Sequence, residues 1–75
     1  MDMRRLVGRN VRRAREAKGW SQERLAEESG FTQQYISGLE NGRRNPTIVS
    51  IYEMAQALGL GHVTLVQPDD HEDGN

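Results

Sequence analysis

Glycine closes each of four short segments in which apolar residues recur with the spacing of a helix. The four glycines are Gly19, Gly30, Gly42 and Gly59. Glycine is favoured just after a helix because it adopts the left-handed conformation that ends the hydrogen-bond ladder. The pattern therefore predicts helices over residues 3–18, 22–29, 33–41 and 48–58.

The rest of the chain leaves one element undecided. Residues 60–66 contain β-branched side chains that suit a short strand, but the segment is also short enough for one helical turn. In the helix before it, Ile48, Ile51, Ala55 and Leu58 have core spacing, and Tyr52 and Met54 widen that apolar face.

Seventy-five residues form one small domain, and none of them is a cysteine. Without a disulfide or a thiolate zinc site, stability must come from well-formed helices, from oligomerisation, or from both. The sequence contains neither an apolar run of membrane-spanning length nor the apolar core of a signal peptide. We therefore expect an all-α, cytoplasmic protein.

The net charge of −1 hides a strong asymmetry along the chain. Residues 1–45 contain all ten basic residues and six acidic ones, a net charge of +4, whereas residues 46–75 carry −5. The run PDDHEDGN ends the chain, and we expect residues 67–75 to be an acidic, disordered tail. Residues 1–66, the expected functional domain, sum to +3, which favours an anionic partner.

The spacing across the second and third predicted helices is the most specific motif. Leu25 and Ala26 are followed by Gly30 in a tight turn and by Ile36 and Leu39 on the next helix. The small Ala26 allows close approach, and the later apolar pair anchors the third helix against the domain. The pattern indicates a helix-turn-helix whose protruding helix fits the DNA major groove, about 12 Å wide. The alternative is a plain helical hairpin.

The string from Val7 to Leu58, which includes SQERLAEESG, TQQYISGLENG and RRNPT, resembles the phage-repressor/Cro-like helix-turn-helix family, also called the XRE family. The resemblance covers about two thirds of the chain. It implies a compact bundle of four or five helices of the lambda-repressor-like type, which binds operator DNA, usually as a homodimer.

The resemblance also implies which residues read bases. Gln33 and Gln34 open the recognition helix, and a glutamine amide matches the donor and acceptor edge of adenine. Ser37, one turn further along, is a weaker candidate. Gly38 replaces the longer polar residue common in the family and leaves room for a thymine methyl group. The alternative is that both glutamines are simply exposed helix formers.

The same resemblance suggests a set of contacts to phosphate, which position a protein without reading sequence. Gln22 is expected to touch phosphate and to buttress Gln33, and the dipole at the start of its helix favours an anion. The expected phosphate contacts are Ser21, Gln22, Thr32, Asn41, Arg43, Arg44 and Arg12.

Arg15 and Glu40 differ from the other charged residues because each projects at the margin of an apolar face. The resemblance pairs these two positions as a structural salt bridge between the first and third helices. DNA contact by Arg15 is the alternative.

The function expected is sequence-specific regulation of transcription by a homodimer, with helix 33–41 in the major groove. Residues 59–66 are the expected dimerisation segment. Its interface residues would be Leu60, Val63, Leu65 and Val66, with Met54 as an addition, unless these residues only close the core.

An antitoxin or a transcription-bridging module that also binds DNA, acting through a possible protein partner, is the alternative. We expect no enzyme activity, since no nucleophile, base and orienting group are arranged together. We also expect no cofactor, metal or small-molecule ligand and no membrane partner. His71, within the acidic run, has no rigid set of neighbouring ligands.

Overall fold

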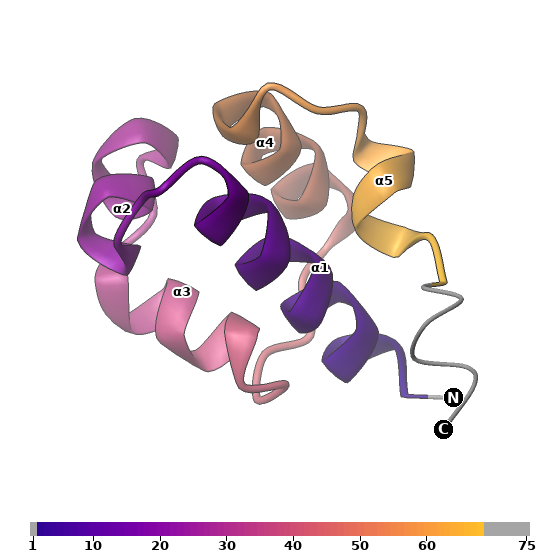
Figure 1. Cartoon of the computed structure of the whole chain (residues 1–75). Helices are drawn as coiled ribbons and strands as arrows, with labels where there is room; N and C mark the ends of the chain where they lie inside the picture. Colours follow the sequence, from indigo (N-terminus) through magenta and orange to yellow (C-terminus); the bar gives the residue numbers. More distant parts are fainter. Residues whose placement is uncertain (1, 69–75) are drawn as a thin grey trace.

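The computed structural model describes residues 2–68, which form five helices and no strands (Figure 1). The helices are α1 (Met3–Ala17), α2 (Gln22–Ser29), α3 (Gln33–Glu40), α4 (Ile48–Leu58) and α5 (His62–Val66). The four predicted helices are confirmed to within one residue at each end. Residues 69–75 of the expected acidic tail, His71 included, lie outside the described residues.

Short polar side chains begin four of these helices. Asp2, Ser21, Thr32 and Thr47 each accept a hydrogen bond from a backbone N–H in the first turn of the helix that follows. Between α2 and α3, Gly30 has φ of +82° and donates its N–H to the Ala26 carbonyl. This left-handed residue ends α2 abruptly, so α3 can begin after only three residues.

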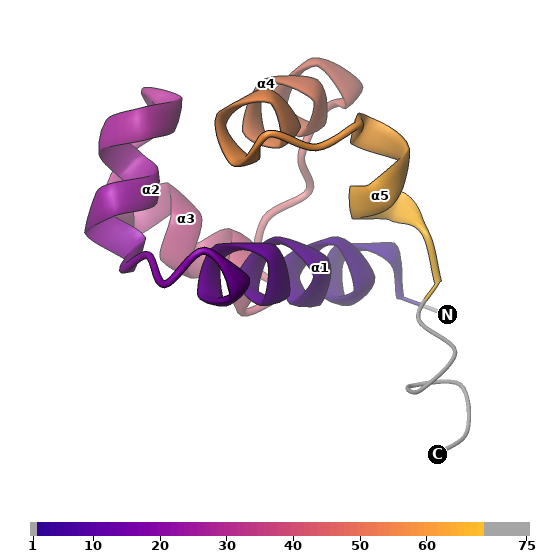
Figure 2. The ribbon, with the colours of Figure 1, turned by 45° about the horizontal axis from the view of Figure 1, so that its top comes forward.

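The helices form two groups joined by α1. Figures 1 and 2 show α2 and α3 together at one end of the molecule, α4 and α5 at the other, and α1 running across both. Accordingly, α1 packs against α3 and α5, and α2 packs against α3 and α4. No described helix has the length and apolar character needed to cross a bilayer.

All five helices contribute to one hydrophobic core. Its residues are Leu6, Val7, Val11, Leu25, Ile36, Leu39, Ile51, Met54, Ala55, Leu58 and Leu65. The prediction that Ile48 and Tyr52 belong to the apolar core face of α4 is wrong, because these residues are 65% and 49% exposed. The buried arc of α4 runs from Met54 to Ala55 around the helix, with Ile51 and Leu58 between them, which leaves Ile48 and Tyr52 beyond its edge.

The undecided segment is a helix held by a buried polar residue of α1. Asn10 is only 9% exposed, and its Nδ2 donates to the carbonyl oxygens of Leu65 at 2.9 Å and Gln67 at 3.0 Å. These bonds fix the end of α5 against α1. A strand here would have no neighbouring strand to pair with among the described residues, and Leu65 would lose its place in the core.

Close contact between α1 and α3 depends on Gly8. A Cβ atom at this position would overlap the carbonyl oxygen of Leu39 and lie 3.1 Å from that of Glu40. Because both atoms belong to the backbone of α3, no side-chain rotation can relieve the overlap. Gly8 therefore sets how near the end of α3 lies to α1.

We expect Gly8→Ala to lower the free energy of unfolding by about 1–3 kcal/mol, the usual range for overpacking. The matched control is Gly38→Ala, because Gly38 is also helical but its added methyl would meet only the flexible side chain of Arg44. Alanine in place of a helical glycine should then be neutral or stabilising by up to about 1 kcal/mol. Urea unfolding of both variants checks this, and equal midpoints would contradict the role given to Gly8.

Candidate nucleic-acid interface

A hollow on the exposed side of α3 gathers most of the residues expected to contact DNA. We call it the α3 hollow, and it is lined by Gln22, Gln33, Gln34, Ser37, Gly38, Arg43 and Arg44. Gln33 and Gln34 are exposed, and Ser37 is half-buried. The surface thus combines uncharged donors and acceptors with two guanidinium groups, a mixture that suits base edges flanked by phosphates.

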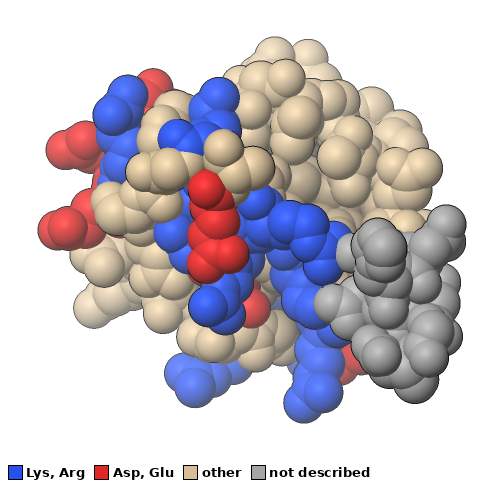
Figure 3. All heavy atoms as spheres, in the orientation of Figure 1, with Lys and Arg blue, Asp and Glu red and all other residues tan. Residues whose placement is uncertain are grey.

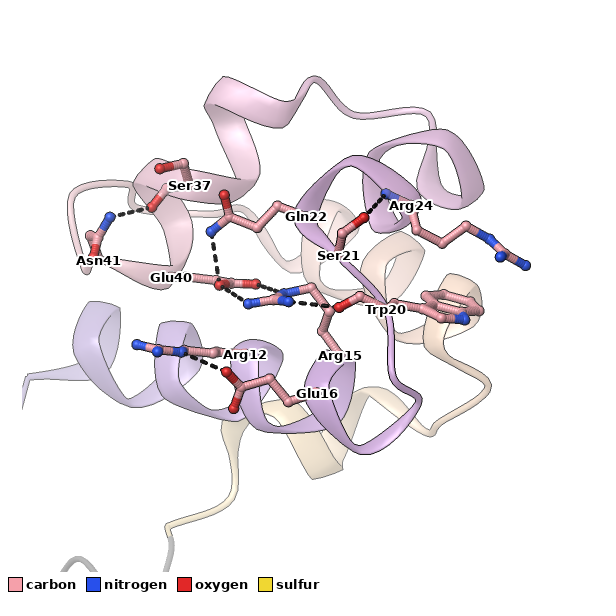
Figure 4. Close-up of polar contacts among 10 residues, drawn as sticks. All are labelled: Arg12, Arg15, Glu16, Trp20, Ser21, Gln22, Arg24, Ser37, Glu40 and Asn41. Carbon is pink, nitrogen blue, oxygen red and sulfur yellow. Dashed lines mark hydrogen bonds and ion pairs between the residues drawn. The ribbon is translucent and has the colours of Figure 1, made fainter.

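Arg15 and Glu40 form an ion pair beneath this surface (Figure 4). Arg15 Nε donates to Glu40 Oε2 at 2.7 Å, and Nη2 donates to Oε1 at 3.0 Å. Arg15 Nη1 donates to the Trp20 carbonyl oxygen at 2.7 Å. The side chains of Arg15 and Glu40 are 11% and 3% exposed, so this guanidinium is committed to the interior rather than to DNA.

The hydrogen bonds to Glu40 raise the pKa of Arg15 above its ordinary value, against the opposing effect of burial. The same carboxylate reaches a third helix, because Gln22 Nε2 donates to Glu40 Oε1 at 3.1 Å (Figure 4). Glu40 therefore ties α1, α2 and α3 together. Gln22 is held by Glu40 rather than by the expected contact with Gln33, although both glutamines line the α3 hollow.

Three of the expected phosphate contacts lie at helix ends and cap them. Ser21 Oγ accepts from the Arg24 N–H, and Thr32 Oγ1 accepts from the Tyr35 N–H, both at 3.0 Å. Asn41 Nδ2 donates to the Ser37 carbonyl at 2.9 Å. The hydroxyl groups of Ser21 and Thr32 still have a hydrogen to donate, so capping leaves them able to bind a phosphate oxygen.

The basic residues are distributed unevenly over the surface. Figure 3 shows Lys and Arg side chains over α1 and around the α2–α3 end, while the surface over α4 and α5 on this face carries no charge. Arg12 lies outside the α3 hollow and pairs with Glu16 at 3.2 Å, with 61% of its side chain exposed.

Trp20 does not line the α3 hollow, but it contacts the residues that hold α1 and α2 in place. Its backbone carbonyl accepts from Arg15, and Lys18 Nζ and Arg24 Cζ lie 4.8 Å and 5.0 Å from its ring. The ring is half-buried beside the start of α2. The basic neighbours of the tryptophan were visible in the sequence, but its carbonyl contact depends on the fold.

The expected dimer segment needs a correction. Leu65 and Met54 are 0% and 1% exposed, so both belong to the core of the single chain and offer no surface to a partner. The cause is that residues 62–66 are helical, which divides their apolar side chains between opposite faces. Leu60 and Val63 are 37% and 57% exposed, and Val66 is half-buried.

Exposed apolar side chains of α4 extend this surface. We define the α4–α5 patch as Ile48, Val49, Tyr52, Leu60 and Val63, all of which are exposed. The rings of Tyr52 and His62 lie 6.0 Å apart and connect the two helices. The patch lies at an end with few charges, since Glu53 is the one Asp, Glu, Lys or Arg residue within α4 and α5.

Comparison with known proteins agrees with this architecture. A family model described as Helix-turn-helix, HTH_3, matches residues 11–65. An uncharacterized HTH-type transcriptional regulator of Sinorhizobium fredii, y4dJ, is 60% identical over 70 residues, which is 93% of this chain and 91% of that protein.

Two solved structures share the fold. The hypothetical transcription factor NHTF from Neisseria has a TM-score of 0.88 and 37% identity, covering 97% of this chain and 84% of its own. The restriction-modification controller protein C.AhdI from Aeromonas hydrophila has a TM-score of 0.79 and 40% identity, covering 83% of this chain and 94% of its own.

The expected lambda-repressor-like fold is confirmed by these neighbours. The family model spans well over half of the sequence, and the relatives extend along most of it. The chain therefore belongs to the HTH_3, or XRE-type, family of helix-turn-helix DNA-binding transcription regulators, which are generally not enzymes.

Proposed function

We propose that this protein binds operator DNA sequence-specifically as a homodimer and thereby regulates transcription. The observation that carries the proposal is the α3 hollow, in which Gln33, Gln34 and Ser37 project from a helix on the surface of the domain. Residues 1–66 would perform this function. Two related proteins described as a transcription factor and a restriction-modification controller support the same reading.

The chemistry and position of each residue suggest whether it would read bases or contact phosphates. Gln33 and Gln34 would read bases in the major groove, where an amide can pair with the N6 and N7 atoms of adenine. Ser21, Thr32 and Asn41, at the ends of α2 and α3, would contact the phosphates on either side of that groove. Each phosphate neutralised by an arginine should steepen the dependence of log K on log salt by about 0.9.

Dimerisation would use the α4–α5 patch. Solvent-exposed apolar residues on two helices with a single acidic residue, Glu53, and outside the α3 hollow, suit a symmetric contact between two copies. The two copies of α3 would then enter successive major grooves, with half-sites centred about 34 Å apart. Such a dimer predicts a palindromic operator.

Selection of bound duplexes from random DNA tests the proposal. We expect wild-type protein to select a palindromic site, and we expect Gln33→Ala or Gln34→Ala to weaken binding to it by about 1–3 kcal/mol while relaxing preference at one position per half-site. The matched control is Gln67→Ala, since Gln67 is an exposed glutamine outside both the α3 hollow and the α4–α5 patch, and Asn10 contacts only its backbone carbonyl. The proposal fails if the wild type selects no sequence, as expected for a module that binds only proteins, or if all three variants behave like the wild type.

A further inference from the structure

Gly38 is the one position in the α3 hollow without a side chain, and Arg44 occupies the space above it. A Cβ atom built on Gly38 would lie 3.0 Å from Arg44 Nε, 3.2 Å from Cγ and 3.6 Å from Cδ. The arginine therefore crosses from the loop after α3 and lies flat against the helix. The expectation that Gly38 leaves room for a thymine methyl group is wrong for this conformation.

An aromatic pair supports the far end of the arginine. Arg44 Cζ lies 5.4 Å from the centroid of the Tyr35 ring, a cation–π distance. Tyr35 is itself stacked on Phe31, with centroids 4.8 Å apart and planes 15° from parallel. The guanidinium therefore lies along α3 between Gly38, which faces Nε, and the ring of Tyr35 in the first turn.

This guanidinium has hydrogen-bond donors to offer. Within residues 2–68, no carboxylate pairs with Arg44, in contrast to Arg15, whose donors are used by Glu40 and Trp20. Arg44 is exposed and lines the same hollow as Gln34. A planar fork of donors thus lies on the surface that would face base edges.

We propose that Arg44 reads a guanine through its O6 and N7 atoms, and that Gly38 is the positioning residue that makes this possible. The inference rests on the proposed DNA-binding function and adds a base-reading arginine from outside α3. It also changes the role expected for Arg44, from phosphate contact to base contact. Arg43, its exposed neighbour, keeps the phosphate role and supplies a matched control.

Competition between duplexes tests the idea, using the site selected by wild-type protein and versions with each guanine replaced. A bidentate arginine–guanine contact should favour one guanine by about 5- to 150-fold. We expect Arg44→Ala to lose this preference. Arg44→Lys should only reduce it while keeping the wild-type salt slope, because lysine keeps the charge and can donate to the same two atoms but lacks the planar fork. Arg43→Ala should instead weaken binding to all duplexes equally and reduce the slope by about 0.9 for each copy of the chain, or about 1.8 for a dimer on the palindromic site.

Gly38→Ala provides a second test. Its methyl would push Arg44 Nε away from α3 by a few tenths of an ångström, so the guanine preference should fall, while the melting temperature stays equal to or above that of the wild type. A destabilised fold could not produce that combination.

The outcomes separate this inference from the proposed function. If the wild type selects a site but Arg44→Ala discriminates guanine as well as the wild type, Arg44 is not a base reader and only this inference is overturned. The same holds if Arg44→Ala weakens binding to all duplexes equally, as Arg43→Ala should. If Gly38→Ala leaves the guanine preference intact, the positioning role given to Gly38 is overturned. If the wild type selects no sequence at all, both the proposed function and this inference fall.

Discussion

Arg15→Met is expected to lower the free energy of unfolding by about 3–5 kcal/mol, the cost of leaving one member of a buried ion pair without its partner. Glu40, 3% exposed, would keep only the hydrogen bond from Gln22. A domain of this size has a total stability of roughly 4–11 kcal/mol, at about 0.05–0.15 kcal/mol per residue. The variant should therefore lose a large share of its stability and unfold at a markedly lower temperature than the wild type.

Two variants make this test specific, with thermal or urea unfolding as the measurement. Arg12→Met removes an arginine from the same helix, but Arg12 and Glu16 are 61% and 55% exposed, and such a pair contributes only about 0–1 kcal/mol. Combining Arg15→Met with Glu40→Leu should recover much of the loss, since no uncompensated charge remains. If Arg15→Met and Arg12→Met unfold at the same temperature or urea concentration, the ion pair between Arg15 and Glu40 does not hold α1 to α3.

The pH dependence of this contribution has a definite sign. The pKa of Arg15 is raised in the folded state, chiefly by its hydrogen bonds to Glu40. The stability that the charged guanidinium contributes is therefore fully present when the pH is below the ordinary pKa of arginine. It is lost only when the pH rises through the still higher pKa that Arg15 has in the folded state. Unfolding in mild alkali should leave the difference between wild type and Arg15→Met unchanged.

The local structure was predictable because its signals are local. A Ser or Thr cap before a segment and a glycine after it fix where α2, α3 and α4 begin and end, whatever lies beyond them. The tight turn at Gly30 that joins α2 to α3 likewise follows from residues close in sequence. Arg15 and Glu40 could be paired only through the family resemblance, since 25 residues separate them.

Features that depend on contacts between distant segments were missed. Gly8 is an isolated glycine in a helix, and Asn10 is a polar residue on an apolar face. Both features indicate a close contact with another segment, but the sequence does not show which segment that is. The partners, Leu39 and Leu65, come from other helices. The burial of Leu65 depends on the hydrogen bonds that Asn10 donates to the end of α5. This contact could not be predicted, so the sequence alone places Leu65 on the dimer surface.

The α4–α5 patch leads to the other large expected effect. Changing both Tyr52 and Val63 to Glu should convert a dimer into a monomer and lower the affinity for the palindromic operator by about 10²- to 10⁴-fold, the gain that two linked half-sites provide. In a two-fold interface each substitution occurs twice, so four carboxylates would have to be buried near one another. Sedimentation at tens of micromolar and DNA titration measure the two effects.

Binding to an isolated half-site distinguishes this mechanism from damage to the reading surface. The double variant should bind a single half-site as wild-type monomer does, because Tyr52 and Val63 are 49% and 57% exposed and neither lines the α3 hollow. Met3→Glu is the control, since Met3 is also 49% exposed but lies beside Asn45 and Pro46, outside the patch. A wild type that sediments as a monomer, or a double variant that remains dimeric, would show that the α4–α5 patch does not join two copies. Loss of half-site binding would instead mean that α4 and α5 support the position of α3 within one chain.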